Sequence, residues 1–423
     1  MRKFLIHFSF SLLITHHSSL ITFSYAEGRS ISLDEAYQLA LKRSETLAQQ
    51  KEAVAQIQAR IDELWGSIKP RFSLTGSQQW QDEAESSGFS SFTQTSRPQA
   101  AITGHQPLFS GFREYLAVKG ARAQRESAEL SLARAEQLLY QDVARSYLDL
   151  LGIHQEIATR EAQVKITQNR IRELNSRERL GRSRKSEVLA VESQWAQTEA
   201  QLEESRGREK IFQAMLQFLT GVQENLVPQE VAIPSVENLS SFLERAHQRP
   251  DVESKRKELA SSGLLTRIQK RQWWPSIALD GNYYLKRPAG FQESIKWDAT
   301  VSAQMPLYWG GSVRAEVRGA EAGERSAQEA LSLAERRAEL EVRSAYSDLE
   351  SSLSIVKALE KALNLAEANA KAQAEDYRLG LVTNLDVLGS LSTLQDTRLK
   401  LDQAKLAAYL ARLQLEVAAG GPQ

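Results

Sequence analysis

Few residues in this chain could carry out covalent chemistry. The chain has 423 residues, no cysteine and six histidines, of which three fall within the first 17 positions. The other three, His105, His154 and His247, are far apart in the sequence. Without thiols or a histidine cluster, the chain has no evident set of metal ligands, nucleophiles or bases. The sequence therefore predicts no catalytic residue, no metal site and no cofactor, and it argues against an enzyme.

Positive and negative charges balance along the chain. There are 53 Lys and Arg residues against 53 Asp and Glu residues, and charged residues make up 25% of the total. A nucleic-acid-binding protein usually carries a surplus of positive charge on one surface. The composition therefore argues against a nucleic-acid partner and against a strongly acidic one.

The N-terminal segment has the pattern of an export signal. Arg2 and Lys3 precede an apolar run over residues 4–14, and Ser24-Tyr25-Ala26 places small residues at the two positions that a signal peptidase reads. Histidines at positions 16 and 17 interrupt this run well short of the roughly 20 residues of a membrane-spanning helix. We expect residues 1–26 to be a signal peptide, cleaved after about Ala26. Export without cysteines is compatible with a Gram-negative envelope.

The rest of the chain reads as a tandem duplication. The motif Pro-Leu-Phe-Ser-Gly at residues 107–111 recurs as Pro-Leu-Tyr-Trp-Gly at residues 306–310, and Arg-Leu-Gly at 179–181 recurs at 378–380. Matches in the same order across most of both halves indicate a structural repeat. We expect a first repeat at residues 27–220, a linker at 221–240 and a second repeat at 241–423. Each repeat should contain a helix, two strands, a very long helix, a turn and a final helix.

The long helices are predicted over about Gly111 to Arg179 and Gly311 to Arg378. Neither stretch contains proline, and each would run close to 100 Å at about 1.5 Å per residue. Apolar residues three and four positions apart indicate packing along the length of another helix. The final helix has two such seams: Leu385, Leu388, Leu399, Leu406, Tyr409 and Leu413 on one side, and Leu391, Leu394, Leu401, Ala408 and Leu415 on the other. Two seams predict two neighbours, although a compact bundle or a simple coiled coil would fit them equally well.

Between the helices, the apolar period changes to two. In the second repeat, Ile277, Leu279 and Gly281 alternate with polar residues. Strands are expected at about 71–81, 98–107, 275–286 and 296–306, each near the ten residues of a tilted membrane-spanning strand. Five tryptophans lie within or beside them, where indole rings could meet lipid headgroups: Trp80, Trp273, Trp274, Trp297 and Trp309. A soluble sandwich is the alternative, but two hairpins would give it little core.

Four strands cannot close a transmembrane barrel alone, because such barrels begin at about eight strands and an open edge leaves backbone groups unpaired in lipid. We therefore expect a homo-oligomer whose strands share one barrel. Its polar strand faces would line the lumen, its apolar faces would contact lipid, and the long helices would extend the pore into a tube on one side.

The sequence also resembles a known family. The run YRLGLVTNLDVL at residues 377–388, its weaker duplicate around residues 179–189, and Arg249-Pro250-Asp251 are similar to the TolC-like outer membrane efflux protein family. The resemblance implies a mainly α protomer with transmembrane β: a homotrimer with a 12-stranded outer-membrane β-barrel, continued by a periplasmic α-helical barrel. It further implies a passive duct in the outer membrane of a Gram-negative bacterium. The duct would be served by a periplasmic adaptor (membrane fusion) protein and an inner-membrane pump or ABC transporter.

The resemblance also implies roles for particular residues. Adaptor-contacting tips would be Arg179, Leu180, Gly181, Arg378, Leu379 and Gly380. Asp386, Glu187 and Tyr377 would lie at the channel entrance. The two carboxylates, repeated in each subunit, would form rings around the entrance, and Tyr377 would help to hold the channel closed. The chain departs from the family pattern at Val382 and Gly389, so we expect gating to rest on other contacts. Asp386 also fits a helix-capping signature, and a non-pore periplasmic adaptor or coiled-coil spacer remains an alternative function.

Overall fold

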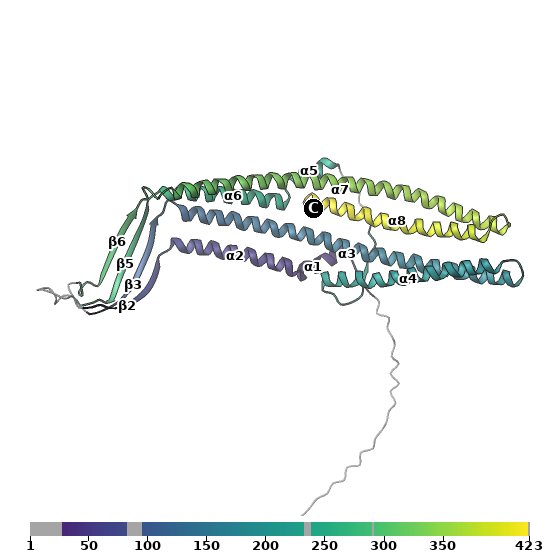
Figure 1. The fold of residues 1–423 in the computed structure, drawn as a ribbon, viewed down its shortest axis with the longest axis horizontal. Coiled ribbons are helices and arrows are strands. Elements are labelled where there is room, and N and C mark those ends of the chain that lie inside the picture. The colour runs from purple at the N-terminus through teal and green to yellow at the C-terminus, as the bar shows by residue number, and fades with distance from the viewer. Residues whose placement is uncertain (1–27, 83–94, 232–237, 290–291, 422–423) are drawn as a thin grey trace, which may run out of the picture.

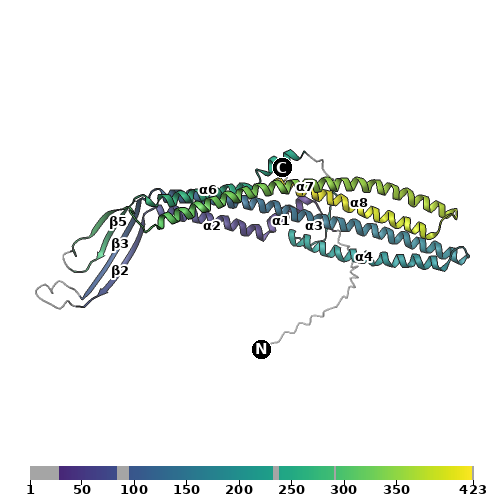
Figure 2. The same cartoon turned by 45° about the horizontal axis from the view of Figure 1, so that its top comes forward.

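The protomer is long and narrow, with the long strands at one end and, at the other, the turns that connect α3 to α4 and α7 to α8 (Figures 1 and 2). The computed structural model describes residues 28–82, 95–231, 238–289 and 292–421. The predicted signal peptide at residues 1–26 lies outside the described residues.

The strand end is one antiparallel sheet built from both repeats. Its strands are β2 (Arg71–Trp80), β3 (Ser96–Phe109), β5 (Ser276–Lys286) and β6 (Trp297–Gln304), in the order β2-β3-β5-β6. The two hairpins join through the pairing of β3 with β5. In the described part of the chain, β2 and β6 each have one edge without a partner strand.

The register of this sheet gathers apolar side chains on one face. Leu74 lies opposite Ile102, Ile102 opposite Tyr283, and Tyr283 opposite Trp297, so one apolar row crosses all four strands. These side chains are not buried within the protomer: Leu74 is 72% exposed and Val301 66%. Ser73 and Thr103 bond at 2.7 Å on the other face. The sheet therefore has one apolar and one polar face, both open in the isolated protomer.

The two long helices are α3 (Arg113–Arg179) and α7 (Ser312–Arg378), each of 67 residues and thus roughly 100 Å long. Each turns back into a shorter helix, α4 (Lys185–Thr220) and α8 (Asn384–Ala418) respectively.

The two predicted seams of α8 meet two different helices. Leu401 and Ala408 pack with Val356 of α7, whereas Leu406 and Leu413 join the core built around α1, α3 and α4. Leu385, which we expected at the start of the latter seam, is 69% exposed because it lies at the tip, beyond the packed part of the helices. Apart from that first position, α8 has the two neighbours that its sequence predicts.

The first helix of each repeat is broken in two, whereas the sequence predicted one. In the first repeat, α1 (Leu33–Arg43) ends at Ser44, whose hydroxyl caps α2 (Glu45–Ile68) by accepting from the Leu47 N–H. In the second, α5 (Leu239–Ala246) is followed by α6 (Pro250–Lys270) and the short 3₁₀ turn η2 (Arg271–Trp273). Proline at the start of α6 cannot continue a preceding helix.

A small parallel sheet, absent from the sequence prediction, crosses the middle of the molecule. It pairs β1 (Arg29–Ile31) with β4 (Leu226–Pro228), which falls in the expected linker. The buried Tyr147 of α3 fastens both strands: its hydroxyl donates to the Ile31 carbonyl at 2.9 Å and accepts from the Gln229 N–H at 2.7 Å. The N-terminal segment is thereby tied to the helical core.

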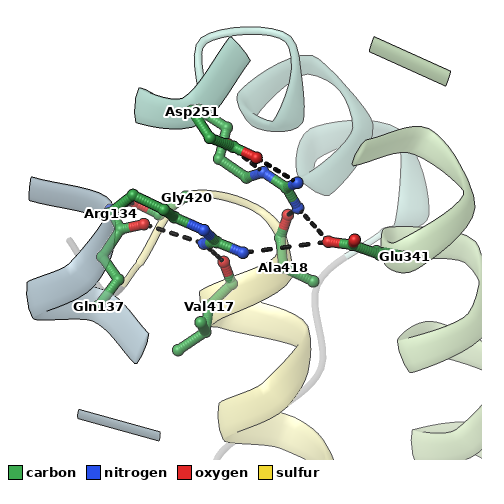
Figure 3. A network of polar contacts seen from close by, with 8 residues as sticks. Arg134, Gln137, Asp251, Glu341, Val417, Ala418 and Gly420 are labelled. Atoms are coloured by element: carbon green, nitrogen blue, oxygen red, sulfur yellow. Dashed lines mark hydrogen bonds and ion pairs between the residues drawn. The ribbon is translucent and has the colours of Figure 1, made fainter. Parts of the chain in front are cut away.

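Two arginines hold the C-terminal end of α8 (Figure 3). The guanidinium of Arg249, 2% exposed, makes two hydrogen bonds to Asp251, at 2.6 and 2.8 Å, and one to Glu341 at 2.6 Å. It also donates to the Ala418 carbonyl, and Arg134 donates to the Val417 carbonyl at 2.7 Å. The carbonyls at this end of a helix lack intrahelical partners and carry partial negative charge. The two arginines therefore supply hydrogen bonds to these carbonyls and stabilise the end of α8.

Burial alone would raise the pKa of Asp251, but its hydrogen bonds to Arg249 and the charge of Arg249 lower it below the ordinary value. Because the folded-state pKa is the lower one, this stabilisation is present at neutral pH. It is lost as the pH falls below the ordinary carboxyl range toward the lowered pKa.

Replacing Arg249 by Ala should destabilise the protein by about 3–5 kcal/mol, because Asp251 and Glu341 would lose a buried counter-charge. The measurement is denaturant unfolding of the purified protein in detergent. Arg398→Ala is the matched control: Arg398 pairs with Glu367 at 3.1 Å, both side chains are nearly half exposed, and the expected loss is below about 1 kcal/mol. Equal losses of stability in the two variants would contradict this account of Arg249.

Candidate functional site

The helical tips are built around two glycines in the left-handed conformation. Gly181 (φ 70°) follows the end of α3, and Gly380 (φ 77°) follows the end of α7. A side chain at either glycine would meet no atom within 4 Å, so the requirement is conformational rather than spatial. The neighbouring Leu180 and Leu379 are both exposed. Each tip therefore presents a leucine to solvent beside an arginine that ends the helix.

Asp386 begins α8 as a helix cap. Its carboxylate accepts from the Thr383 N–H at 2.8 Å and from the Thr383 hydroxyl at 2.6 Å, while the Thr383 hydroxyl accepts from the Asp386 N–H. These hydrogen bonds from Thr383 lower the pKa of Asp386 below its ordinary value. Asp386 is exposed and remains charged at neutral pH, so the capping arrangement also holds a negative charge at the tip.

Glu187 occupies the matching place in the other tip. It lies in the first turn of α4 and accepts from the Ser183 hydroxyl at 2.8 Å. The residue before α4 is Arg184, whose side chain makes no capping hydrogen bond, in contrast to Thr383 before α8. The two tips therefore share a carboxylate in the first helical turn, exposed at Asp386 and half-buried at Glu187, but position it through different partners.

Tyr377 joins the two helical hairpins through a residue that sequence reasoning missed. The guanidinium carbon of Arg170, on α3, lies 4.3 Å from the centre of the Tyr377 ring. Arg170 also donates to the Asn384 side-chain oxygen at 2.8 Å, and Asn384 is 3% exposed. Arg177 lies over the same ring at 5.0 Å. Cation–π stacking and a buried hydrogen bond thus connect α3 to both helices of the second hairpin.

The predicted interface tryptophans fall at two levels along the strands. Trp80 ends β2 and Trp297 begins β6, so both lie at the end of the sheet away from the helices. Trp273 and Trp274 precede β5, and Trp309 follows β6, at the junction with the helices. Trp80, Trp274, Trp297 and Trp309 are exposed. Exposed tryptophans thus lie toward both ends of the strands, and their contact with lipid headgroups stays a prediction.

The described residues hold no group of three or more His, Asp or Glu side chains placed to bind a metal ion. Within the same residues, no helix combines the length and the hydropathy needed to cross a membrane.

Comparison with known proteins gives consistent matches over most of the chain. The model of a family described as "Outer membrane efflux protein" matches residues 36–222 and 244–421. The outer membrane efflux protein BepC of Brucella suis is 24% identical over 322 residues, which cover 75% of this chain and 70% of BepC. The outer membrane protein TolC of Vibrio cholerae is 30% identical over a shorter stretch, 44% of this chain and 41% of TolC.

Among solved structures, the protomer is similar to CusC, whose crystal structures were described in connection with transmembrane channel formation. The TM-score is 0.83 at 18% sequence identity, and the alignment covers 92% of each chain. Such a likeness at low identity shows a shared fold over most of the chain.

Replacing Asp386 by Asn should separate its charge from its capping role. The Asn side-chain oxygen still accepts from the Thr383 N–H, so α8 should begin at the same place, while the tip loses a negative charge. If the tip borders an ion path, cation preference in a reversal-potential measurement should fall. Asp396→Asn, an exposed carboxylate further along α8, is the control. An equal change in both variants would show that cation preference does not depend on a carboxylate at position 386 in particular.

Proposed function

This chain belongs to the outer membrane efflux protein family, and we propose that it is the passive outer-membrane channel of a tripartite efflux or type I secretion system. The observation that carries this function is a four-stranded sheet with an exposed apolar face, continuous with helices of roughly 100 Å. The relatives are outer-membrane channels. A non-pore periplasmic adaptor or a coiled-coil spacer is not favoured, because neither needs such a sheet.

A homotrimer completes the pore. Along the protomer, neighbouring elements follow the orders β2-β3-β5-β6, α2-α3-α6-α7 and α4-α3-α8-α7. One edge of the protomer is thus always β2, α2 or α4, and the other is β6 or α7. Two different edges make head-to-tail contacts that close into a ring. Two copies would give eight strands and three would give twelve; the family resemblance supports three.

The apolar face of the sheet would contact outer membrane lipid and the helices would extend into the periplasm, after export directed by residues 1–26. The helical tips would meet a periplasmic adaptor through Arg179, Leu180 and Gly181 and their duplicates Arg378, Leu379 and Gly380. An inner-membrane pump or ABC transporter would supply substrate and energy. The chain itself would bind no cofactor and catalyse no reaction.

The entrance would be formed at the tips by Asp386, Glu187 and Tyr377, with one copy of each from every subunit. Rings of carboxylates favour cations at a pore mouth. The contact of Arg170 with Tyr377 and Asn384 would hold the two hairpins of each subunit together, and its loss would widen the entrance.

The test is the mass of the purified mature protein in detergent, followed by single-channel recording in a planar bilayer. We expect a trimer with long-lived, cation-biased currents. A monomer or dimer without conductance would exclude the duct and return the adaptor or spacer to consideration.

Arginine on the two faces of the sheet should have different effects. Val301→Arg, on the apolar face, should hamper barrel assembly by about 2–4 kcal/mol per subunit near mid-membrane. Ser302→Arg, the next residue along β6, lies on the polar face and should alter conductance more than assembly. Trimer yield and conductance measure the two effects, and equal assembly defects would contradict the assignment of the faces.

A further inference from the structure

The polar face of the sheet carries one row of residues in which charges of both signs lie beside a histidine. Arg71 of β2 lies opposite His105 of β3, which lies opposite Asp280 of β5, which in turn lies opposite Thr300 of β6. We name these four residues the His105 row. His105 Nδ1 is 2.7 Å from Asp280 Oδ1, and both side chains are about half exposed. The row thus crosses all four strands and remains open to solvent on the polar face.

The net charge of this row depends on one proton. With neutral His105, the positive charge of Arg71 and the negative charge of Asp280 cancel. With protonated His105, each subunit contributes one positive charge, and a ring of three subunits contributes three. Histidine is the side chain whose charge ordinarily changes between about pH 5 and pH 8. The row therefore has no net charge when His105 is neutral and one positive charge per subunit when His105 is protonated.

Neighbouring groups on the polar face leave this change uncompensated. In the next row outward, Asp298 accepts a hydrogen bond from Asn282 at 2.8 Å and pairs with Arg287 at 3.2 Å, so its charge is already balanced. On β6, Thr300 and Ser302 are uncharged. Two residues before Arg71, Lys69 follows the end of α2 and adds a further positive charge. Hence no carboxylate other than Asp280 faces His105 from the strands beside it.

We infer that the His105 row determines the ion selectivity of the strand-lined part of the duct, and that protonation of His105 shifts this selectivity toward anions. The inference rests on the proposed function, because the polar face lines a lumen only if the apolar face meets lipid. The row lies toward the helical end of the sheet, since Arg71 is the first residue of β2. It forms a second charged ring, well separated from Asp386 at the tip.

The experiment measures reversal potentials of the full mature protein in planar bilayers under a dilute KCl gradient, at about pH 8 and about pH 5.5. Low salt is needed because the Debye length is about 30 Å at 0.01 M and about 10 Å at 0.1 M. We expect the permeability of Cl⁻ relative to K⁺ to rise roughly twofold on acidification, a modest change because the ring acts across water. Asp386 keeps its charge over this range, since its pKa is lowered.

Three variants make the test specific. His105→Gln can still donate to Asp280 but cannot gain a charge, so the pH effect should vanish. His154→Gln is the matched control: His154 contacts Glu209 at 3.0 Å between α3 and α4, away from the sheet, and the pH effect should remain. Asp280→Asn leaves the charge of Arg71 uncancelled, so its selectivity at about pH 8 should resemble that of the acidified natural protein. The trimer mass of each variant confirms assembly.

A pH effect that persists in His105→Gln, or a conducting natural protein without any pH effect, would overturn the inference and leave the duct intact. Absence of a pore would overturn the proposed function and this inference with it.

Discussion

The unpaired edges of the four-stranded sheet are the constraint on which the rest of the structure depends. Within the residues that the structure describes, backbone groups on the free edges of β2 and β6 have no partner strand, and lipid supplies none. The sheet is stable in a membrane only if a second copy pairs with each edge. Because the two edges differ, that pairing is head-to-tail, and the same operation carries α2 and α4 of one copy to α7 of the next. Closure of the strands therefore imposes closure of the helices.

Each repeat supplies one helix of roughly 100 Å, and duplication sets two such helices side by side. Arg134, Arg249, Asp251 and Glu341 form a clamp at the end of α8 that joins the two repeats. Arg134 comes from the first long helix, while Arg249, Asp251 and Glu341 come from the second repeat, and all converge where α8 ends. A helix end buried without such partners would leave its carbonyls unsatisfied. The clamp lies about midway along the molecule, and the strand end and the helical tips extend from it in opposite directions (Figure 1).

Local patterns predicted those parts of the fold that local physics determines. Alternation at Ile277, Leu279 and Gly281 predicted the faces of β5, and the seams through Leu401 and Leu406 predicted two neighbours for α8. The parallel pairing of β1 with β4 brings together residues about 200 positions apart, and three-residue strands carry no recognisable period. Arg170 was missed for a related reason: comparison of the repeats points to shared residues, and the residue matching Arg170 in the second repeat is Asn369.

That difference between the repeats has a structural consequence at the tips. If the two repeats were identical, each cation of the first hairpin would have a counterpart at the matching position of the second. Arg170 instead reaches from the first hairpin to Tyr377 and Asn384 of the second, and the second repeat offers no cation in return at the matching position. The contact is therefore one-sided, and a ring of subunits carries one such contact in each copy. Arg170 does not act alone, because Arg177 lies over the same Tyr377 ring and Leu388 of α8 packs in one cluster with Leu174 of α3. The two hairpins are therefore joined at the tips by cation–π contacts, a buried hydrogen bond and apolar packing, and near the C-terminal end of α8 by Arg134 and Arg249.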